Sequence, residues 1–268
     1  MSHEYDWLMQ LAGDLALRAS AVARERFARC DAWRKADRTW ATDADNAAQK
    51  RITDELAERY PDHAVLAEET LAEASRRVDP AAAEFCWVID PLDGTRNFVR
   101  GVPVFATAIA VLHKGRPVAA AVADAMTGLL YRAVAGGGSF AAGRRLAVRQ
   151  EPPGPEALVA FPSGRDQPTL PNILAGLARF TLRNLGSSAL HLALVAGGAL
   201  DAAFCLECKL WDLAAGALLV LEAGGRVSDL DGNDRACFDL SHDLQADTPY
   251  VAGSAAFVAE LLAILRRR

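Results

Sequence analysis

Cysteine is scarce in this sequence and follows no framework. The 268 residues include five cysteines at scattered positions, and an odd, dispersed set argues against the disulfide scaffold of a small secreted domain. Cys205 and Cys208 form a single C-x-x-C pair. Because no second Cys or His pair lies nearby, we interpret them as ordinary thiols on or near a strand. The five histidines are also dispersed, with no spacing suited to a catalytic triad or to zinc.

Long apolar runs and an excess of positive charge are missing as well. The longest apolar stretches, residues 189–204 and 213–223, are interrupted by His191, Asp201 and Glu222, which argues against a segment that spans a bilayer. The first residues lack the pattern of a signal peptide. The net charge of −5 gives no electrostatic reason to expect a nucleic-acid partner. We therefore expect a cytoplasmic protein with no membrane and no direct nucleic-acid partner.

Apolar residues are plentiful enough for a large core. They make up 51% of the chain, and the length fits one large domain or two closely joined ones. Residues 4–29 and 43–60 carry apolar side chains at helical spacing, and the polar residues 30–40 between them predict an exposed loop. Strand patterns joined by hairpin-like turns follow as far as residue 141.

A change of pattern marks a boundary in the middle of the chain. Residues 150–155 hold three prolines and a glycine, and strands and helices alternate after them. We expect an α+β part over residues 1–149 and an α/β part over residues 150–268.

Two carboxylates leave one predicted strand together. The apolar run of residues 85–89 is typical of a buried strand, and Asp90-Pro91-Leu92-Asp93-Gly94-Thr95 follows it. Crowded carboxylates repel one another unless a cation lies between them. The backbone N–H groups of a helix that begins here would attract an anion. Adjacent cation and anion sites predict metal-assisted phosphate chemistry.

Two more acidic positions stand out. Glu68 follows a short strand-like segment, and Asp212 follows Trp211 at the start of an apolar helical run. Each acidic position also has a purely structural explanation. Glu68 could belong to a solvated loop, Asp212 could be the N-cap of its helix, and Asp90 and Asp93 could be turn formers. The two kinds of explanation are compatible, because an N-cap aspartate can also bind a metal.

Five segments, in order along the chain, resemble the inositol monophosphatase family. Residues 87–98 resemble one signature of the family, and Trp211-Asp212-Leu213-Ala214-Ala215-Gly216 with Glu222-Ala223-Gly224-Gly225 resembles the other. The remaining matches are Glu68-Glu69, the set Lys35, Asp37, Thr42 and Asp45, and Gly186-Ser187-Ser188-Ala189. Together they run from about residue 35 to residue 225, and the chain length is also typical of the family.

The resemblance implies a layered α-β-α-β-α sandwich with an active site between its two parts. It also implies hydrolysis of a small phosphate monoester by metal-activated water, with two or three Mg²⁺ ions, Mn²⁺ as an alternative and Li⁺ as an inhibitor. The implied metal ligands are the carboxylates of Glu68, Asp90, Asp93 and Asp212 and the backbone carbonyl of Leu92. Such hard oxygen ligands suit Mg²⁺ or Mn²⁺.

The resemblance further implies roles around the metals. Thr95, with Glu68 and Asp45, would orient the attacking water. The substrate side would comprise Asp93, Gly94, Thr95, Ser187, Ser188 and Cys205. Further candidates, each with an exposed surface position as the alternative, are Lys35, Arg165, Arg183 and Glu207.

The substrate side departs from the family pattern at one position. Family members that cleave inositol phosphate commonly carry a glutamate where this chain has Cys205, and a thiol is a poor hydrogen-bond acceptor. Glu207 would share a face with Cys205 on a regular strand and would replace that glutamate only after a local shift. We expect inositol monophosphate as substrate, with histidinol phosphate, fructose 1,6-bisphosphate and 3′-phosphoadenosine 5′-phosphate as alternatives.

Two other classes of function compete with this interpretation. Haloacid-dehalogenase-like phosphatases carry D-x-D-G-T after a strand, but here Pro91 fills the place of their nucleophile and cannot attack phosphorus. Some bacterial members of the inositol monophosphatase family also bind transcription machinery, which leaves a non-catalytic binding protein as an alternative. The family resemblance also suggests a homodimer.

Overall fold

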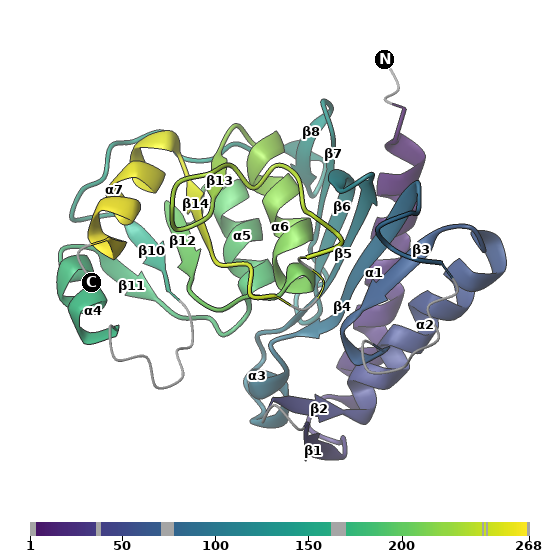
Figure 1. Cartoon of the computed structure of the whole chain (residues 1–268). Coiled ribbons are helices and arrows are strands. Elements are labelled where there is room, and N and C mark those ends of the chain that lie inside the picture. Colours follow the sequence, from purple (N-terminus) through teal and green to yellow (C-terminus); the bar gives the residue numbers. More distant parts are fainter. Residues whose placement is uncertain are drawn as a thin grey trace.

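Helices and sheets alternate in five layers in the computed structural model of the chain (Figure 1). The structure describes residues 4–35, 39–70, 78–161, 170–242, 244 and 246–266. The layered α-β-α-β-α sandwich that the resemblance implies is therefore confirmed.

The first sheet has seven strands and carries the first half of the chain. Its spatial order is β3-β4-β5-β6-β7-β8-β9, with β3 parallel to β4 and every later pair antiparallel. The strands are β3 (Ala64–Ala67), β4 (Phe85–Asp93), β5 (Ala106–His113), β6 (Arg116–Asp124), β7 (Leu130–Val134), β8 (Gly138–Ala141) and β9 (Arg144–Arg145).

The second sheet has five strands in the order β11-β10-β12-β14-β13. The three neighbours β11, β10 and β12 run parallel, and β14 is antiparallel to both β12 and β13. The strands are β10 (Leu158–Ala160), β11 (Thr181–Arg183), β12 (Ala202–Cys205), β13 (Arg226–Ser228) and β14 (Tyr250–Gly253).

Helices cover each sheet on both faces. The outer layers are α1 (Asp6–Arg26) with α2 (Asp43–Arg59) on the first sheet, and α4 (Leu170–Leu177) with α7 (Ala255–Leu265) on the second. Between the sheets lie α5 (Ser188–Ala196) and α6 (Leu210–Glu222) (Figure 1). The buried faces form three main apolar clusters, one at each outer interface and the largest around α5 and α6.

The predicted boundary at residues 149 and 150 falls between β9 of the first sheet and β10 of the second. Because α6 packs against strands of both sheets, the core is continuous across that point. A division into two subdomains stays a prediction.

The prediction of an exposed loop over residues 30–40 was wrong in part. The segments β1 (Ala32–Arg34) and β2 (Trp40–Thr42) pair as an antiparallel ribbon. All of β1 is exposed, so its sequence shows no alternation of buried and exposed residues that would predict a strand. The start of α2 was predicted correctly, because Thr42 and Asp45 form a capping box there.

Two short helices complete the architecture near the acidic residues. They are η1 (Glu68–Thr70), directly after β3, and α3 (Thr95–Val99), directly after β4. Within the described ranges, no helix combines the length and the apolar character needed to cross a bilayer.

Candidate metal centre

Strand β4 continues past the apolar run of residues 85–89 as far as Asp93. Its pairing with β5 shifts register between Asp90 and Asp93, so the ladder is interrupted where the two carboxylates stand. Pro91 has no N–H to give to the ladder, and its carbonyl accepts a hydrogen bond from Thr107 Oγ1 at 2.9 Å. Irregularities of this kind redirect side chains at strand ends, and this one brings both carboxylates to the same site.

Gly94 turns the chain from β4 into α3. Its φ of 101° lies in the left-handed region, and a Cβ atom there would stand 3.0 Å from the carbonyl oxygen of Val104. The turn therefore requires glycine. It places Thr95 at the first position of α3, beside the carboxylates.

Asp212 reaches the same place from the other half of the chain. The N-cap of α6 is Lys209, so the expectation that Asp212 itself is the N-cap was wrong. The cap therefore lies three residues before the expected position, and Leu210 and Trp211 are buried as part of the first turn of the helix. Asp212 lies at the third helical position, and its carboxylate accepts a hydrogen bond from Lys209 N at 3.0 Å.

Carboxylate oxygens of Asp90, Asp93 and Asp212 lie within 4.8 Å of one another. Burial, followed by the charges of Glu68, Asp93 and Asp212, raises the pKa of Asp90 well above its ordinary value. Burial and the charge of Asp212 raise the pKa of Asp93 to about 7. A divalent cation among these oxygens would relieve the repulsion, and a set of oxygen donors without His or Cys fits Mg²⁺ or Mn²⁺.

A cavity of about 250 Å³ opens at this cluster. Seven of the residues expected at the site line it: Glu68, Asp90, Leu92, Asp93, Gly94, Thr95 and Asp212. Sequence reasoning did not assign a role to the other five lining residues, which are Thr39, Trp40, Arg96, Asn97 and Gly186. The acidic residues therefore converge on a space open to a small ligand.

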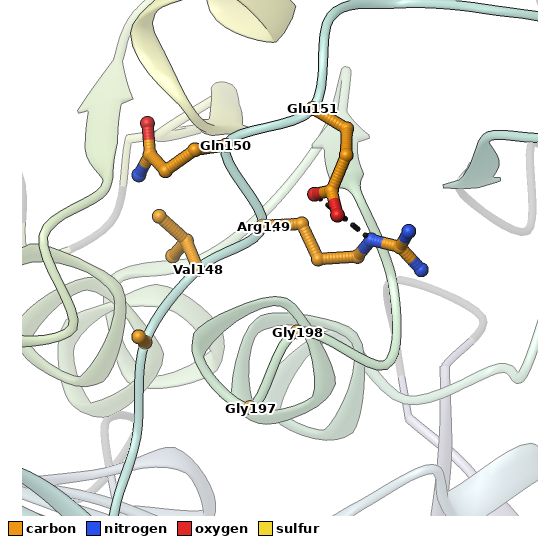
Figure 2. A pocket seen from close by; sticks show the side chains of 7 residues that line it. Val148, Arg149, Gln150, Glu151, Gly197 and Gly198 are labelled. Carbon is orange, nitrogen blue, oxygen red and sulfur yellow. Dashed lines mark hydrogen bonds and ion pairs between the residues drawn. The ribbon is translucent and has the colours of Figure 1, made fainter.

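A larger hollow of about 700 Å³ lies elsewhere, between residues 147–151 and the end of α5 (Figure 2). Its arginine, Arg149, forms ion pairs with Glu151 at 3.3 Å and with Asp201 at 3.4 Å. None of the three clustered aspartates lines this hollow. The acidic cavity, although smaller than this hollow, is the candidate site.

Thr95 and Asp45 form a hydrogen-bonded pair at the edge of the acidic cavity. Thr95 Oγ1 lies 3.2 Å from Asp45 Oδ1 and 3.0 Å from the carbonyl oxygen of Leu92, and its proton can serve one of them at a time. Asp45 is fully buried, and burial raises its pKa to about 7. The structure thus brings together the three residues that the resemblance assigns to orienting water, since Glu68 lines the same cavity.

Lys35 is held by the paired glutamates. Its Nζ lies 3.0 Å from Glu68 Oε1 and 2.6 Å from Glu69 Oε1. Although burial opposes the charge of Lys35, these carboxylates raise its pKa above the ordinary value. Burial raises the pKa of Glu68 to about 8. Asp37, which the resemblance places in the same segment, lies outside the described residues.

The residues expected on the substrate side are less closely grouped. Ser187 and Ala189, at the start of α5, both donate hydrogen bonds to Asp93, from Oγ at 2.5 Å and from N at 2.6 Å. Ser188 lies between them at the first position of the helix. The sequence predicted Ser187 near the substrate but gave no sign of its bond to Asp93, because the two are 94 residues apart.

Cys205 is buried, and its thiol donates to the carbonyl oxygen of Glu207 at 3.0 Å. Strand β12 ends at Cys205 and Glu207 is exposed beyond it, so the shared strand face expected for these two residues was wrong. Arg183 is exposed at the end of β11. Arg165 lies outside the described residues.

Known proteins resemble this chain over almost its whole length. The sequence profile of the inositol monophosphatase family matches residues 5–267. A relative from Escherichia coli named Nus factor SuhB is 35% identical over 266 residues, covering 94% of this chain and 95% of the relative. A relative of the same name from Pseudomonas aeruginosa is 36% identical over 274 residues, covering 96% and 97%.

Solved structures show the same fold. The extragenic suppressor protein suhB from Bartonella henselae superposes with a TM-score of 0.85 at 27% identity, covering 98% of this chain and 99% of that one. An IMPase from Thermotoga maritima gives a TM-score of 0.84 at 25% identity, with 97% of both chains covered. With the matching profile, the relatives and the converging carboxylates, this chain belongs to the inositol monophosphatase family.

Proposed function

We propose that this protein hydrolyses a small phosphate monoester with the help of Mg²⁺. The observation that carries the proposal is the convergence of Asp90, Asp93 and Asp212 on one cavity. They come from β4 and α6, two elements more than a hundred residues apart in sequence, and they meet beside Thr95. Membership of the family supports a phosphatase.

The ligands proposed for two or three Mg²⁺ ions are Glu68, Asp90, Asp93, Asp212 and the carbonyl oxygen of Leu92. When bound there, Mg²⁺ would neutralise phosphate charge and make water a better nucleophile. Asp45 holds the hydroxyl of Thr95, which would orient the attacking water with Glu68. The backbone N–H groups of Gly94 and Thr95 would hold phosphate oxygens at the start of α3.

The substrate proposed first is inositol monophosphate. A cavity of about 250 Å³ is below the usual range for drug-sized ligands, which favours a small polyol or sugar phosphate. The alternatives within the same chemistry are histidinol phosphate, fructose 1,6-bisphosphate and 3′-phosphoadenosine 5′-phosphate. A homodimer in the cytoplasm stays part of the proposal.

Phosphate release from these four esters, measured with Mg²⁺ and with the metal removed by EDTA, tests the proposal. We expect turnover of at least one ester that disappears with EDTA and returns with Mg²⁺, and inhibition by Li⁺. No turnover of any ester by folded, Mg²⁺-loaded protein would contradict the phosphatase assignment. A Cys205→Glu variant that turns over inositol 1-phosphate no better than the parent would show that the missing acceptor does not limit specificity.

A second candidate function is association with the transcription machinery. The observation that favours it is the name Nus factor carried by relatives that are 35% and 36% identical over almost the whole chain. Purified protein added to a reconstituted transcription reaction would change elongation or termination if this role holds. An Asp212→Asn variant with the same effect would show that the role is independent of hydrolysis, and no effect of either protein would exclude it under those conditions.

A further inference from the structure

The start of α5 contacts Asp93 through two hydrogen bonds to a single oxygen. Ser187 Oγ and Ala189 N both donate to Oδ2 of Asp93, at 2.5 and 2.6 Å. Asp93 belongs to β4 of the first sheet, whereas Ser187 and Ala189 belong to the helix that packs between the sheets. With Oδ2 engaged in this way, the carboxylate is held in one orientation relative to Asp90 and Asp212.

The hydroxyl of Ser187 is used within the protein as both donor and acceptor. It donates to Asp93 and, as the N-cap of α5, accepts from Leu190 N at 3.2 Å. Only 1% of the residue is exposed. A hydroxyl engaged on both sides and closed off from solvent is poorly placed to bind a leaving group.

Asn97 fastens the chain segment that leads into Ser187. Its side-chain amide donates to the carbonyl oxygens of Val104 at 2.8 Å and Leu185 at 2.7 Å. Gly186 packs so closely that a Cβ atom there would stand 2.8 Å from Asn97 Nδ2, and its φ of 74° also favours glycine. This single amide therefore joins α3, the segment before β5 and the segment before α5.

We infer that Ser187 is a positioning residue for the metal ligand Asp93, supported by Asn97, and that it does not bind substrate. The inference deepens the proposed function, because it concerns the same site. Its physical basis is that a carboxylate fixed by two hydrogen bonds needs less ordering when a cation binds. The metal centre is then complete only while the start of α5 is docked against β4.

Mn²⁺ titration followed by electron paramagnetic resonance, without substrate, tests the inference on full-length protein. We expect Ser187→Ala to raise the Mn²⁺ dissociation constant about tenfold, and Ser187→Thr, which keeps the hydroxyl, to stay within about threefold of the parent. With metal at saturation, the KM of the Ser187→Ala variant for the best ester should stay within about twofold of the parent.

Ser254→Ala is the matched control. Ser254 is also a buried N-cap serine, and its hydroxyl accepts from Phe257 N at the start of α7, far from the acidic residues in sequence. Its loss should lower thermal stability about as much as a lost helix cap does, with unchanged Mn²⁺ affinity. Equal effects of both variants on Mn²⁺ affinity would overturn the inference, because a general loss of stability would then explain them.

Asn97→Ala provides a second, independent test, should Ser187→Ala fold poorly. We expect its Mn²⁺ affinity to fall at least about threefold, because the segment before Ser187 loses its hydrogen bond from Asn97 and with it the link to the segment before β5. Unchanged Mn²⁺ affinity in the variants, together with a KM raised about tenfold, would assign Ser187 to the substrate instead. Since the titration needs no substrate, a protein that hydrolyses no ester would defeat the proposed function and leave this inference standing.

Discussion

Two aspartates, Asp201 and Asp212, show how the surroundings of a residue decide what its carboxylate does. Asp201 accepts a hydrogen bond from Leu158 N at 2.8 Å and pairs with Arg149, so its charge is compensated within the protein. Asp212 lies instead among other carboxylates, and burial raises its pKa. The first arrangement stabilises the fold, whereas the second costs stability unless a cation is bound.

The exchange Asp212→Asn should therefore separate stability from function. Removing one of several crowded negative charges should raise the melting temperature of the metal-free protein. The same change should lower phosphate release by roughly a thousandfold or more, because cation stabilisation of the reacting phosphate is worth several kcal/mol. Calorimetry in EDTA and a phosphate-release assay measure the two effects.

Asp201→Asn is the control for this pair of measurements. It should lose stability, because Arg149 loses a charged partner, and should keep its turnover at saturating Mg²⁺. A folded Asp212→Asn protein with parental turnover at limiting Mg²⁺ would rule out Asp212 as a metal ligand.

Helices α5 and α6 are the elements on which the candidate centre depends. Asp212 stands in the first turn of α6, and α5 presents its start to Asp93. The two helices pack closely where Gly216 of α6 faces Leu192 of α5, since a Cβ atom on Gly216 would lie 2.5 Å from Leu192 Cβ. Neither Gly216 nor its neighbours can give way easily, because α6 is buried between the two sheets.

Gly216→Ala should destabilise the protein by about 1–3 kcal/mol through overpacking, although alanine favours helices. Gly197→Ala is the matched control at the end of α5, where φ is −81° and the nearest atom to a Cβ would be 3.5 Å away. That control should change stability by less than about 0.5 kcal/mol. Urea unfolding measures both, and equal stability of the two variants would contradict close packing of the helices.

At the scale of the whole molecule, the raised pKa values couple stability to pH and to metal. The pKa values of Asp93 and Glu68 rise from 3.8 to about 7 and from 4.5 to about 8. A carboxyl group whose pKa is higher in the folded state contributes stability that is fully present below its unfolded pKa and is lost as pH rises through its folded pKa. His191 has the opposite effect on the pH dependence of stability, because burial lowers its pKa from 6.5 to about 4. The stability that neutral His191 contributes is therefore lost as the pH falls from about 6.5 to about 4.

Metal-free protein should therefore lose stability between about pH 6 and pH 8, where the acidic cluster gives up its last protons. Added Mg²⁺ competes with those protons, so it should raise the melting temperature more at pH 8 than at pH 6. Thermal unfolding with EDTA and with Mg²⁺ at the two pH values measures this. An equal rise in melting temperature at both pH values would show that metal binding is not coupled to the protonation of the acidic cluster.

The sequence by itself determined the local features of the structure, namely the turns and helix starts that depend on a few neighbouring residues. The turn from β4 through Gly94 into Thr95, and the capping box that starts α2, were predictable because each involves a few consecutive residues. The resemblance to the family extended this to the layered fold and to the set of acidic residues. The roles of those residues stay predictions.

Only the tertiary structure decided which distant groups meet. The contact of Ser187 with Asp93 spans 94 residues and that of Asn97 with Leu185 spans 88, and neither has a local pattern. The paired strands β1 and β2 and the early end of β12 at Cys205 were missed for a related reason. Local periodicity reports which face of an element is buried, but which partners face each other depends on how helices and sheets pack, and that is a property of the whole core.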